Sequence, residues 1–600
     1  MKFAHYFLAL HLWGLAFSAV HGQGYNLLVG GGSIDSNCDL TDEHWADATY
    51  QWFVNRSKLS GPNGGNGRIL IVDYETYSQC DQSNPGSFVG ECAYFRCLGA
   101  VEADHVCVAD GGGSGRSSCL NPDSDEVYDL ILEYDGLWFR GGDQSRYVDN
   151  WKNTMTESAI HKVWSAGGVL GGTSAGAMIQ SEVVSTGDAP SWEATGDPFQ
   201  NSIQLTADFF AGPHAMLNET VVDSHFFTRA RLGRLSVFLA RLEQSAGISY
   251  LGIGVDAETG LAVYPDGTGQ VLGEGSVSFI FPSSETEVQL EQRKPPYISN
   301  LETHILTEGF HFDLQSRVIL TVPDSATPSG PFPSAPASQP TVINGAVEAD
   351  RQKASLYISN PTTQNALWQG KLLLAEGTPG IDNGLATTNL EDSSALRENR
   401  AGGPLWGLKE QASQGLAVFT DGYSGSSCNA VQVHSDGSLT ALAGKGCPRE
   451  QSVVVVDCCG LEWVDQSRWD PDGDGKKRQS VALTPCRTTL WNSQLGASAY
   501  LPRCLNQGPA PFCGDGICGP GEDSCSCPED CGPPPPVETN CSDGIDNDCD
   551  GLIDDEDPDC QADCLPAGST CFVDQDCCSE KCVGRPGNRK CQSSGGRLFE

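Results

Sequence analysis

A serine lies at the centre of a G-x-S-x-G pentad, Gly172–Gly176, directly after the apolar residues Val169 and Leu170. This pattern is typical of a nucleophile elbow, where a strand ends, the chain turns sharply and a helix begins. Small residues flank the serine because the turn is strained and the backbones pack closely. We expect the turn to expose Ser174 Oγ and the helix N-terminus behind it to offer N–H groups to a developing oxyanion. By itself, the pentad more often marks a tight turn than an active site.

A serine nucleophile needs a base to take its proton, and His225 is the natural candidate. It lies in the short run Asp223–Phe226. A lone histidine is more often a satisfied core residue than a base, so the assignment depends on the motifs that accompany it.

Three stretches of the chain together resemble the cyanophycinase branch of the S51 serine peptidases, whose fold is shared with class I glutamine amidotransferases. Phe139–Gln144 is similar to the family's F-x-G-G-D-Q motif, and Gly172–Ala177 is similar to its elbow. Asp223–Leu235 follows the family's D-Q-H-F-x-x-R-x-R-x-x-R-L pattern, with Ser224 in place of the glutamine. The resemblance extends from Tyr25 to Val322, about half of the chain.

The resemblance implies a serine exopeptidase in which Ser174 is the nucleophile and His225 the general base, with the backbone amides of Gly142 and Ala175 holding the oxyanion. The family cleaves a β-aspartyl-arginine polymer, cyanophycin, and the same pocket would suit other β-aspartyl peptides. No cofactor is expected for this catalysis. The residues that would line the substrate pocket are Gln144, Asp223, Arg229, Arg231 and Arg234.

The third member of the triad is the point at which the chain departs from the family. The family's glutamate, in a segment G-I-D-E-x-T-A, falls by position on Ala257, which Asp256 and Glu258 flank. In an extended strand both acids would point to the face opposite Ala257, so either could serve only after a local change of the backbone. Loss of the acid that orients the histidine costs about 10⁴ in rate but leaves residual catalysis.

Two alternatives therefore stay open. The arginines at 229, 231 and 234 could form a solvated helix face, with 231 and 234 as neighbours and 229 on another side. The whole chain could also be a catalytically inactive, calcium-dependent protein that binds a surface or matrix. Ala257 favours the inactive protein, whereas the Ser174 and His225 pair favours the enzyme.

Cysteine usage and the N-terminus both indicate export. Residues 1–22 carry one Lys, a short apolar run and small residues before Gly22, as a signal peptide does; the run is shorter than a membrane anchor needs. The 26 cysteines form four even clusters, which is typical of disulfides closed locally in a secreted or periplasmic protein. No cysteine lies from Leu120 to Ser427, which excludes a cysteine nucleophile at the elbow.

The chain of 600 residues is strongly acidic, with a formal net charge of −41. The stretch Cys513–Cys560 alone holds fifteen Asp and Glu and no Lys or Arg. Such acidity argues against a nucleic-acid partner and favours cations. We expect a peptide or polymer substrate rich in β-linked aspartate, no nucleic-acid partner and no membrane span.

Short apolar runs predict an α/β fold with a doubly wound, mostly parallel sheet over residues 23–322. The sequence pattern of Ser145–Ala166, between two of these runs, predicts a helix. The motifs lie at the carboxyl ends of the expected strands, where doubly wound folds place their sites. The expected parallel strands are Tyr25–Val29, Arg68–Val72, Leu137–Phe139 and Gly168–Leu170, and the expected closing strands are Gly252–Val255, Leu261–Tyr264, Val277–Phe281, His311–Leu314 and Val318–Val322.

The remainder of the chain reads as smaller parts. A linker rich in Pro and Ser is expected at 323–340, and a β-rich, cystine-stapled domain of unknown function at 341–505. Its strand-like runs are Lys371–Leu374, Leu416–Thr420 and Val453–Val456. The tail is expected to hold a cystine-rich segment at 513–531, an acidic loop at 541–560 and a knottin-like module at 564–591.

The acidic loop fits the pattern of an EF-hand-type calcium site, with Gly551 at the turn. It also resembles the C-D-G-x-D-N-D-C-D-G repeats of secreted bacterial proteins. The alternative is a disordered acidic spacer, and Asp470–Gly475 forms a second, weaker pattern that a plain turn explains equally well. The expected Ca²⁺ ligands are Asp546, Asp548, Asp550, Leu552, Asp554 and Asp557.

Overall fold

The computed structural model describes residues 24–34, 44–75, 90–110 and, with short gaps between 188 and 230, 119–328, followed by shorter stretches, mostly strands, up to residue 591. The chain forms two compact units, Met1–Asn506 and Gln507–Glu600. The predicted signal peptide at 1–22, most of the predicted linker, the cystine-rich segment at 513–531, the weaker acidic pattern at 470–475 and all six predicted calcium ligands lie outside the described residues.

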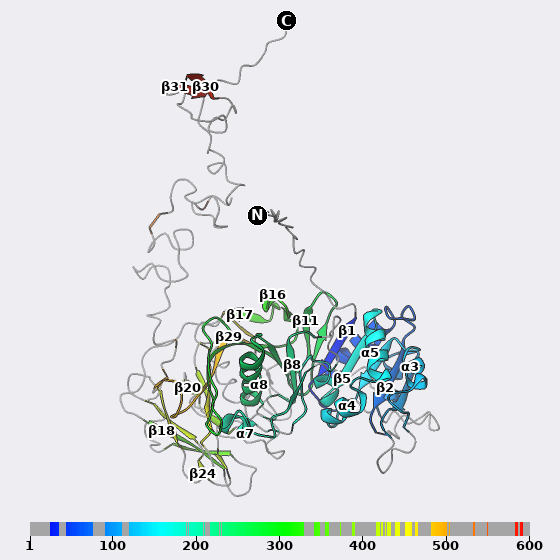
Figure 1. Ribbon diagram of the computed structural model, residues 1–600, viewed down its shortest axis with the longest axis horizontal. Helices are drawn as coiled ribbons and strands as arrows, with labels where there is room; N and C mark the ends of the chain where they lie inside the picture. Colours follow the sequence, from blue (N-terminus) through cyan, green and yellow to red (C-terminus); the bar gives the residue numbers. More distant parts are fainter. Residues whose placement is uncertain are drawn as a thin grey trace, which may run out of the picture. The chain divides into compact units, whose positions relative to one another are not determined.

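The first sheet has nine strands and is parallel in one half only (Figure 1). Strand β1 lies at the boundary between the two halves, with a parallel neighbour on one side and an antiparallel neighbour on the other. The parallel strands are β1 (Tyr25–Val29), β5 (Val169–Thr173), β4 (Gly136–Phe139), β2 (Arg68–Asp73) and β3 (Glu102–Cys107). The antiparallel strands are β10 (Thr259–Val263), β11 (Thr268–Gly273), β15 (His311–Asp313) and β16 (Val318–Thr321).

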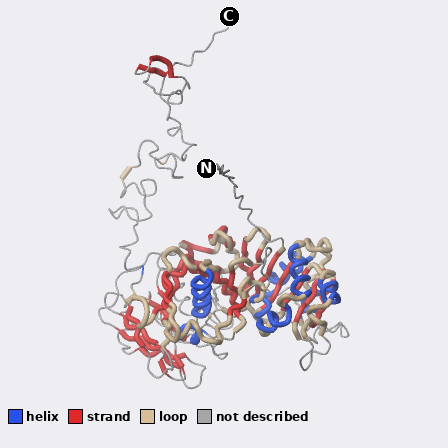
Figure 2. Tube along the Cα trace, viewed as in Figure 1, coloured by secondary structure: helices blue, strands red, loops and turns tan. Residues whose placement is uncertain are grey.

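Helices cover both faces of the parallel half, which explains why β1, β2, β4 and β5 are buried along nearly their whole length (Figure 2). In β2, Leu70 and Val72 join one buried cluster, whereas Ile69 and Ile71 join another on the opposite face. The flanking helices are α1 (Trp45–Ser57), α2 (Glu91–Cys97), α3 (Asp125–Ile131), α4 (Gln144–Trp151) and α5 (Met155–Ser165).

The second sheet has twelve strands and carries the other half of the candidate site. Strands β8 (Thr220–Ser224) and β9 (Leu251–Val255) are parallel neighbours, and helix α8 (Leu232–Ala246) packs on this sheet over one buried cluster. The sheet continues through β12 (Val277–Phe281), β14 (Tyr297–Leu306), β29 (Ala482–Trp491), β27 (Val453–Asp457), β22 (Leu416–Thr420) and β20 (Leu372–Leu373), with β13 (Glu287–Gln289), β17 (Ala326–Pro328), β21 (Thr387–Asn389) and β28 (Trp463–Asp465) beside it.

The remaining elements are short. Strands β18 (Thr341–Val347), β19 (Ala354–Ile358), β25 (Asn429–Val433) and β26 (Leu439–Ala443) form a four-stranded sheet. Three two-stranded sheets and two helices complete the described residues: β6 (Val184–Ser185) with β7 (Leu205–Thr206), β23 (Gly422–Tyr423) with β24 (Ser426–Ser427), β30 (Cys582–Arg585) with β31 (Asn588–Cys591), α6 (Ala175–Met178) and α7 (Ser191–Gly196).

The apolar runs predicted from the sequence are strands, but the expectation of a mostly parallel sheet holds only for β1 to β5 of the first sheet. Most of the other strands pair with antiparallel neighbours. The exceptions among the described residues are β8 with β9, which helix α8 connects, and β20 and β21, which each pair in parallel with β22. The strands expected in a separate region at 341–505 also join the second sheet, since β29 pairs with β14 and β27 pairs with β29. One compact unit therefore includes both stretches.

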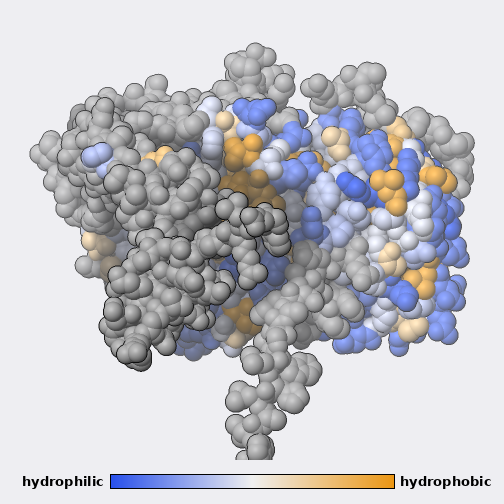
Figure 3. Space-filling view, turned by 90° about the horizontal axis from the view of Figure 1, so that it is seen from above, coloured by the Kyte–Doolittle hydropathy of each residue, from blue (hydrophilic) through white to orange (hydrophobic). Residues whose placement is uncertain are grey.

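Two disulfides join described residues, Cys107–Cys119 and Cys458–Cys486, and each closes within one of the predicted even clusters. Within the described part of the chain, no helix combines the length and apolar character needed to cross a bilayer. Exposed large apolar side chains among these residues, such as Leu59 and Val101, are few. On the face seen in Figure 3, the apolar patches of the described residues are separated by hydrophilic ones.

Candidate active site

Ser174 lies at a sharp turn between β5 and α6. Its backbone has φ 54° and ψ −114°, a combination that is sparsely populated and therefore strained. The flanking glycines are required, because a Cβ on Gly172 would lie 2.3 Å from the Gly176 carbonyl oxygen and one on Gly176 would lie 2.1 Å from that of Phe139. The turn therefore has the form predicted for a nucleophile elbow.

His225 follows β8 of the second sheet and faces Ser174 across the gap between the two sheets. The distance from His225 Nε2 to Ser174 Oγ is 3.0 Å, within hydrogen-bond reach. The histidine is half-buried and also has a positive φ of 46°. Two residues from different sheets thus meet at strained backbone positions.

The end of β1 fixes the site through three successive carbonyl groups. The Ser174 N–H donates to the Val29 carbonyl at 2.8 Å, the His225 N–H donates to Gly30 at 2.8 Å and the Glu258 N–H donates to Gly31 at 2.6 Å. Because these acceptors are consecutive, the nucleophile, the candidate base and one candidate acid are held on a single rigid segment.

The segment 256–258 is a turn between β9 and β10, so the extended strand assumed from the sequence is wrong here. Glu258 has φ 60°, so its backbone is left-handed and not extended. A Cβ on Gly32 would lie 2.8 Å from Glu258 Cγ. Asp256 Oδ2 accepts a hydrogen bond from Ser276 Oγ at 3.3 Å. Ala257 is buried in the same turn.

Asp223, Arg231 and Arg234 form a buried ion cluster, with exposed fractions of 1%, 9% and 4%. Arg231 Nη1 donates to Asp223 Oδ1 at 2.8 Å, while Arg234 donates to the same carboxylate from Nε at 2.7 Å and from Nη2 at 2.6 Å. Burial raises the pKa of the Asp223 carboxyl, but the charges of Arg234 and Arg231 outweigh it and hold the pKa below its ordinary value of 3.8.

The alternative of a solvated helix face is therefore wrong for Arg231 and Arg234, because both turn inward to Asp223. Direct contact of these three residues with a substrate would require the ion pairs to open, so this role stays a prediction. Arg229 differs, since it is exposed and one turn after His225, whose carbonyl accepts the Arg229 N–H at 2.9 Å. Gln144 begins α4 and donates from its side-chain amide to the Ser185 carbonyl at 2.6 Å.

The two candidate oxyanion donors lie on either side of Ser174. Ala175 is the first residue of α6, and helix N-termini leave their first N–H groups without a partner in the helix. Gly142 is exposed and belongs to the segment after β4, where a Cβ on its neighbour Gly141 would lie 3.3 Å from Ser174 Cβ. This close approach brings the Gly141–Gly142 backbone to the serine.

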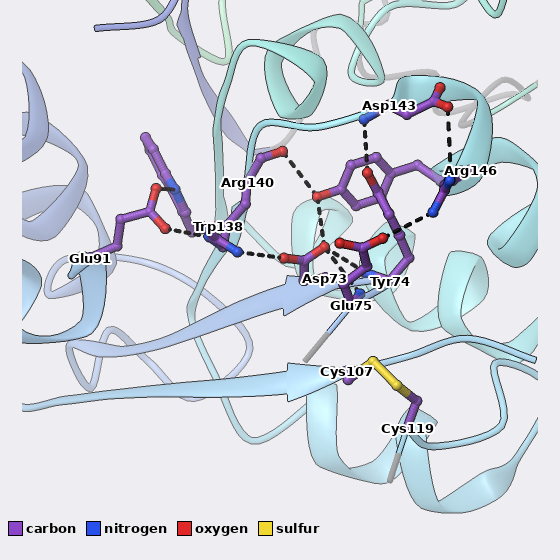
Figure 4. A network of polar contacts seen from close by, with 11 residues as sticks. Asp73, Tyr74, Glu75, Glu91, Cys107, Cys119, Trp138, Arg140, Asp143 and Arg146 are labelled. Carbon is purple, nitrogen blue, oxygen red and sulfur yellow. Dashed lines mark hydrogen bonds and ion pairs between the residues drawn. A yellow bond between two sulfur atoms is a disulfide. The ribbon is translucent and has the colours of Figure 1, made fainter. Parts of the chain in front are cut away.

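A polar network that no motif in the sequence indicated lies beside this segment, and Figure 4 shows it. Arg140 binds the carboxylates of Asp73 and Glu91, and Tyr74 lies below the Gly141–Gly142 segment. An acid directly after a buried strand, as in Val72-Asp73, was the available signal. Among the described residues, no group of three or more His, Cys, Asp or Glu side chains could hold a metal ion.

Comparison with known proteins relates this chain to peptidases. The model of peptidase family S51 matches residues 118–247, which include Ser174 and His225. A cyanophycinase of Trichormus variabilis (strain ATCC 29413 / PCC 7937) is 32% identical over 231 residues, 38% of this chain and 71% of that protein. A solved peptidase from an acI-B1 Actinobacterium covers 49% of this chain and 98% of its own, at 19% identity and a TM-score of 0.31.

A cyanophycinase of Synechococcus elongatus is 30% identical over 229 residues, 38% of this chain. The chain spans 64% of the length of that relative, so the match covers only part of each protein. Residues 118–247, which the family model matches, include the elbow, the histidine and the segment around Gly142. The chain therefore belongs to peptidase family S51.

Proposed function

We propose that this protein is a secreted serine exopeptidase that hydrolyses β-aspartyl-arginine polymer or related β-aspartyl peptides. The observation that carries the proposal is the 3.0 Å separation of Ser174 Oγ and His225 Nε2 at a strained strand-to-helix turn. The relatives named cyanophycinase support this substrate class. A serine beside a base in such a turn is suited to acyl transfer.

In the proposed reaction, Ser174 Oγ attacks the scissile carbonyl carbon while His225 Nε2 takes the hydroxyl proton. The tetrahedral oxyanion accepts hydrogen bonds from the Gly142 and Ala175 N–H groups. The C–N bond then breaks, and His225 gives the proton to the leaving amine. Water repeats the sequence on the acyl-enzyme, releasing the acid and restoring Ser174.

We assign Glu258, rather than Asp256, to the role of orienting His225. A Cβ on Gly31 would lie 2.0 Å from His225 Cε1, and one on the adjacent Gly32 would lie 2.8 Å from Glu258 Cγ, so both side chains lie against neighbouring glycines. The Asp256 carboxylate accepts a hydrogen bond from the Ser276 hydroxyl. The family's glutamate falls by position on Ala257, one residue earlier. The left-handed backbone of Glu258 would let the carboxylate at the next position take over this role.

For the substrate, we propose that Arg229 and Gln144 contact the peptide and that the buried cluster of Asp223, Arg231 and Arg234 holds the chain beneath His225. Arg229 is exposed, and a guanidinium binds carboxylates through paired hydrogen bonds. A substrate rich in aspartyl groups supplies such carboxylates.

The test is hydrolysis of insoluble β-aspartyl-arginine polymer and of a β-aspartyl-arginine dipeptide by the purified protein and by Ser174→Ala. Ser181→Ala is the matched control, because Ser181 is a buried serine bonded to the Met178 and Val183 carbonyls. We expect the first variant to lose activity and the second to keep it. No hydrolysis by the wild-type protein, together with no labelling of Ser174 by a fluorophosphonate, would favour the inactive calcium-dependent surface protein instead.

We also propose that the tail binds Ca²⁺ through the loop Asp546–Asp557, whose alternating carboxylates suit a hard cation. Calorimetric titration of the full chain with calcium chloride tests this, with Asp546→Asn and Asp548→Asn combined as the control. Equal heats for the wild-type and variant chains would refute the site.

A further inference from the structure

Four residues, Arg140–Asp143, cross in front of Ser174 after β4, and we call this segment the donor strip. Its centre is two glycines, and Gly142 has φ 150°, a conformation that other residues rarely adopt. Without side chains at its centre, the strip has little packing of its own to fix it. An oxyanion donor must nevertheless lie about 2.7–3.1 Å from the position that the oxyanion takes, so other groups must hold the strip.

Two tyrosine hydroxyls hold the peptide groups at the two ends of the donor strip. Tyr74 Oη accepts a hydrogen bond from the Asp143 N–H at 2.8 Å, and Tyr147 Oη donates to the Arg140 carbonyl at 3.0 Å. Tyr74 Oη also occupies the space beside Gly142, since it lies 2.3 Å from the position that a Cβ there would take. Hydrogen bonds thus hold the peptide groups on either side of the two glycines, and the Tyr74 hydroxyl fills the space beside Gly142.

The tyrosines are themselves immobilised in the core. Their rings meet edge to face with centroids 4.7 Å apart, and Tyr147 meets Trp151 in the same way at 4.7 Å. Both side chains are buried. Burial raises the pKa of both phenols, so the hydroxyl that donates and the one that accepts stay protonated at neutral pH.

The side chain of Arg140 anchors the start of the donor strip to two buried carboxylates (Figure 4). Its Nη1 donates to Asp73 Oδ2 at 3.0 Å and its Nε donates to Glu91 Oε2 at 2.8 Å, while Trp138 Nε1 donates to Glu91 Oε1 at 3.2 Å. Asp73 accepts the Tyr74 N–H at 2.7 Å, so the ion pair also fixes the tyrosine's backbone.

We infer that Tyr74 and Tyr147 are positioning residues of the peptidase, which act on the reaction by holding the Gly142 N–H where the oxyanion forms. The inference rests on the proposed function, because it gives the donor strip its role. It predicts that removing either hydroxyl lowers the rate of the chemical step while the ground-state substrate is bound as before.

The experiment compares Tyr74→Phe and Tyr147→Phe with Tyr134→Phe as the matched control. Tyr134 is a buried tyrosine of the same core cluster, and its hydroxyl bonds to Asp104 Oδ2 at 2.9 Å, away from the donor strip. With a β-aspartyl-arginine dipeptide as substrate, we expect kcat to fall about 10- to 100-fold in the first two variants and KM to change by less than about threefold. The control keeps both constants within about twofold of wild type, and labelling of Ser174 by a fluorophosphonate slows only in the first two variants.

The outcomes separate this inference from the proposed function. An active wild-type protein whose Tyr74→Phe and Tyr147→Phe variants keep the kcat of the control overturns the inference alone. Variants that lose thermal stability with kcat unchanged show a structural role only and overturn it equally. A wild-type protein that neither cleaves the dipeptide nor reacts with the fluorophosphonate overturns both. Should one variant fail to fold, the other decides, because each acts on a different end of the strip.

Discussion

Replacing Asp223 by asparagine removes the buried carboxylate on which two guanidinium groups converge. Three hydrogen bonds from charged donors and one from the Ser224 N–H, at 3.0 Å, end on this carboxylate. Removing one partner of a buried ion pair costs about 3–5 kcal/mol, because a charge is left uncompensated in a medium of low dielectric constant. We expect a loss of that size in the free energy of unfolding at pH 7.

The sign of the pH dependence follows from the depressed pKa of Asp223. A carboxyl whose folded pKa lies below its unfolded value contributes stability above the unfolded pKa, here near 3.8, and loses it as the pH falls through the folded pKa. The stability gap between wild type and Asp223→Asn should therefore be the same at pH 7 and pH 5. It should shrink only below about pH 3.8, where the wild-type carboxyl takes up a proton.

Urea denaturation followed by tryptophan fluorescence at the two pH values measures this gap. Asp135→Asn is the matched control, because Asp135 is equally buried but accepts hydrogen bonds from the neutral N–H groups of Asn63 and Asn66. Its loss should cost only about 1–2 kcal/mol. A gap below about 1 kcal/mol for Asp223→Asn, or one that closes between pH 7 and pH 5, would refute the reasoning.

Three further outcomes are expected. Glu258→Gln should lower kcat by about 10³–10⁴ with the dipeptide while Asp256→Asn changes it by less than about tenfold, and equal losses would refute the assignment. Gly31→Ala should reduce activity more than about 100-fold, because its Cβ would lie 2.0 Å from His225 Cε1. Gly267→Ala is the control, because a Cβ there meets nothing within 4 Å, and it should lower stability without lowering activity. Truncation after residue 328 should give protein that elutes as aggregates in size-exclusion chromatography, because it exposes the edge of β14. Truncation after Asn506 should not cause aggregation, and a soluble, active chain ending at residue 328 would contradict this prediction.

Much of the parallel half could be predicted from the sequence, because strands buried on both faces are short, apolar and bounded by turn residues. Tyr25–Val29 has the predicted bounds, and the run at Arg68 ends one residue later than expected. The elbow was equally recognisable, since the glycines on either side of Ser174 are imposed by backbone contacts of 2.1–2.3 Å that no larger residue allows.

What could not be predicted depends on contacts between distant parts of the chain. The turn between β9 and β10 needs a left-handed residue at Glu258. No local sequence pattern predicts this conformation for a glutamate. The inward direction of Arg231 and Arg234 depends on a carboxylate of the neighbouring strand, so helical spacing alone suggested a solvated face. Tyr74, directly after β2, and Tyr147, in α4, are far apart in the sequence, and only the fold brings their rings together at the donor strip.

The pairing of β14 with β29 also determines when the protein can be completed. The Thr303 and Thr488 hydroxyls are bonded at 2.8 Å across a separation of 185 residues. At a synthesis rate of about 5–20 residues per second, roughly 10–40 seconds pass between the emergence of the two strands. During this interval β14 presents an unpaired edge to other chains. The second sheet, to which the strand before His225 belongs, is therefore completed late, and the pairing of β14 with β29 is a step of high contact order that exposes the nascent chain to aggregation.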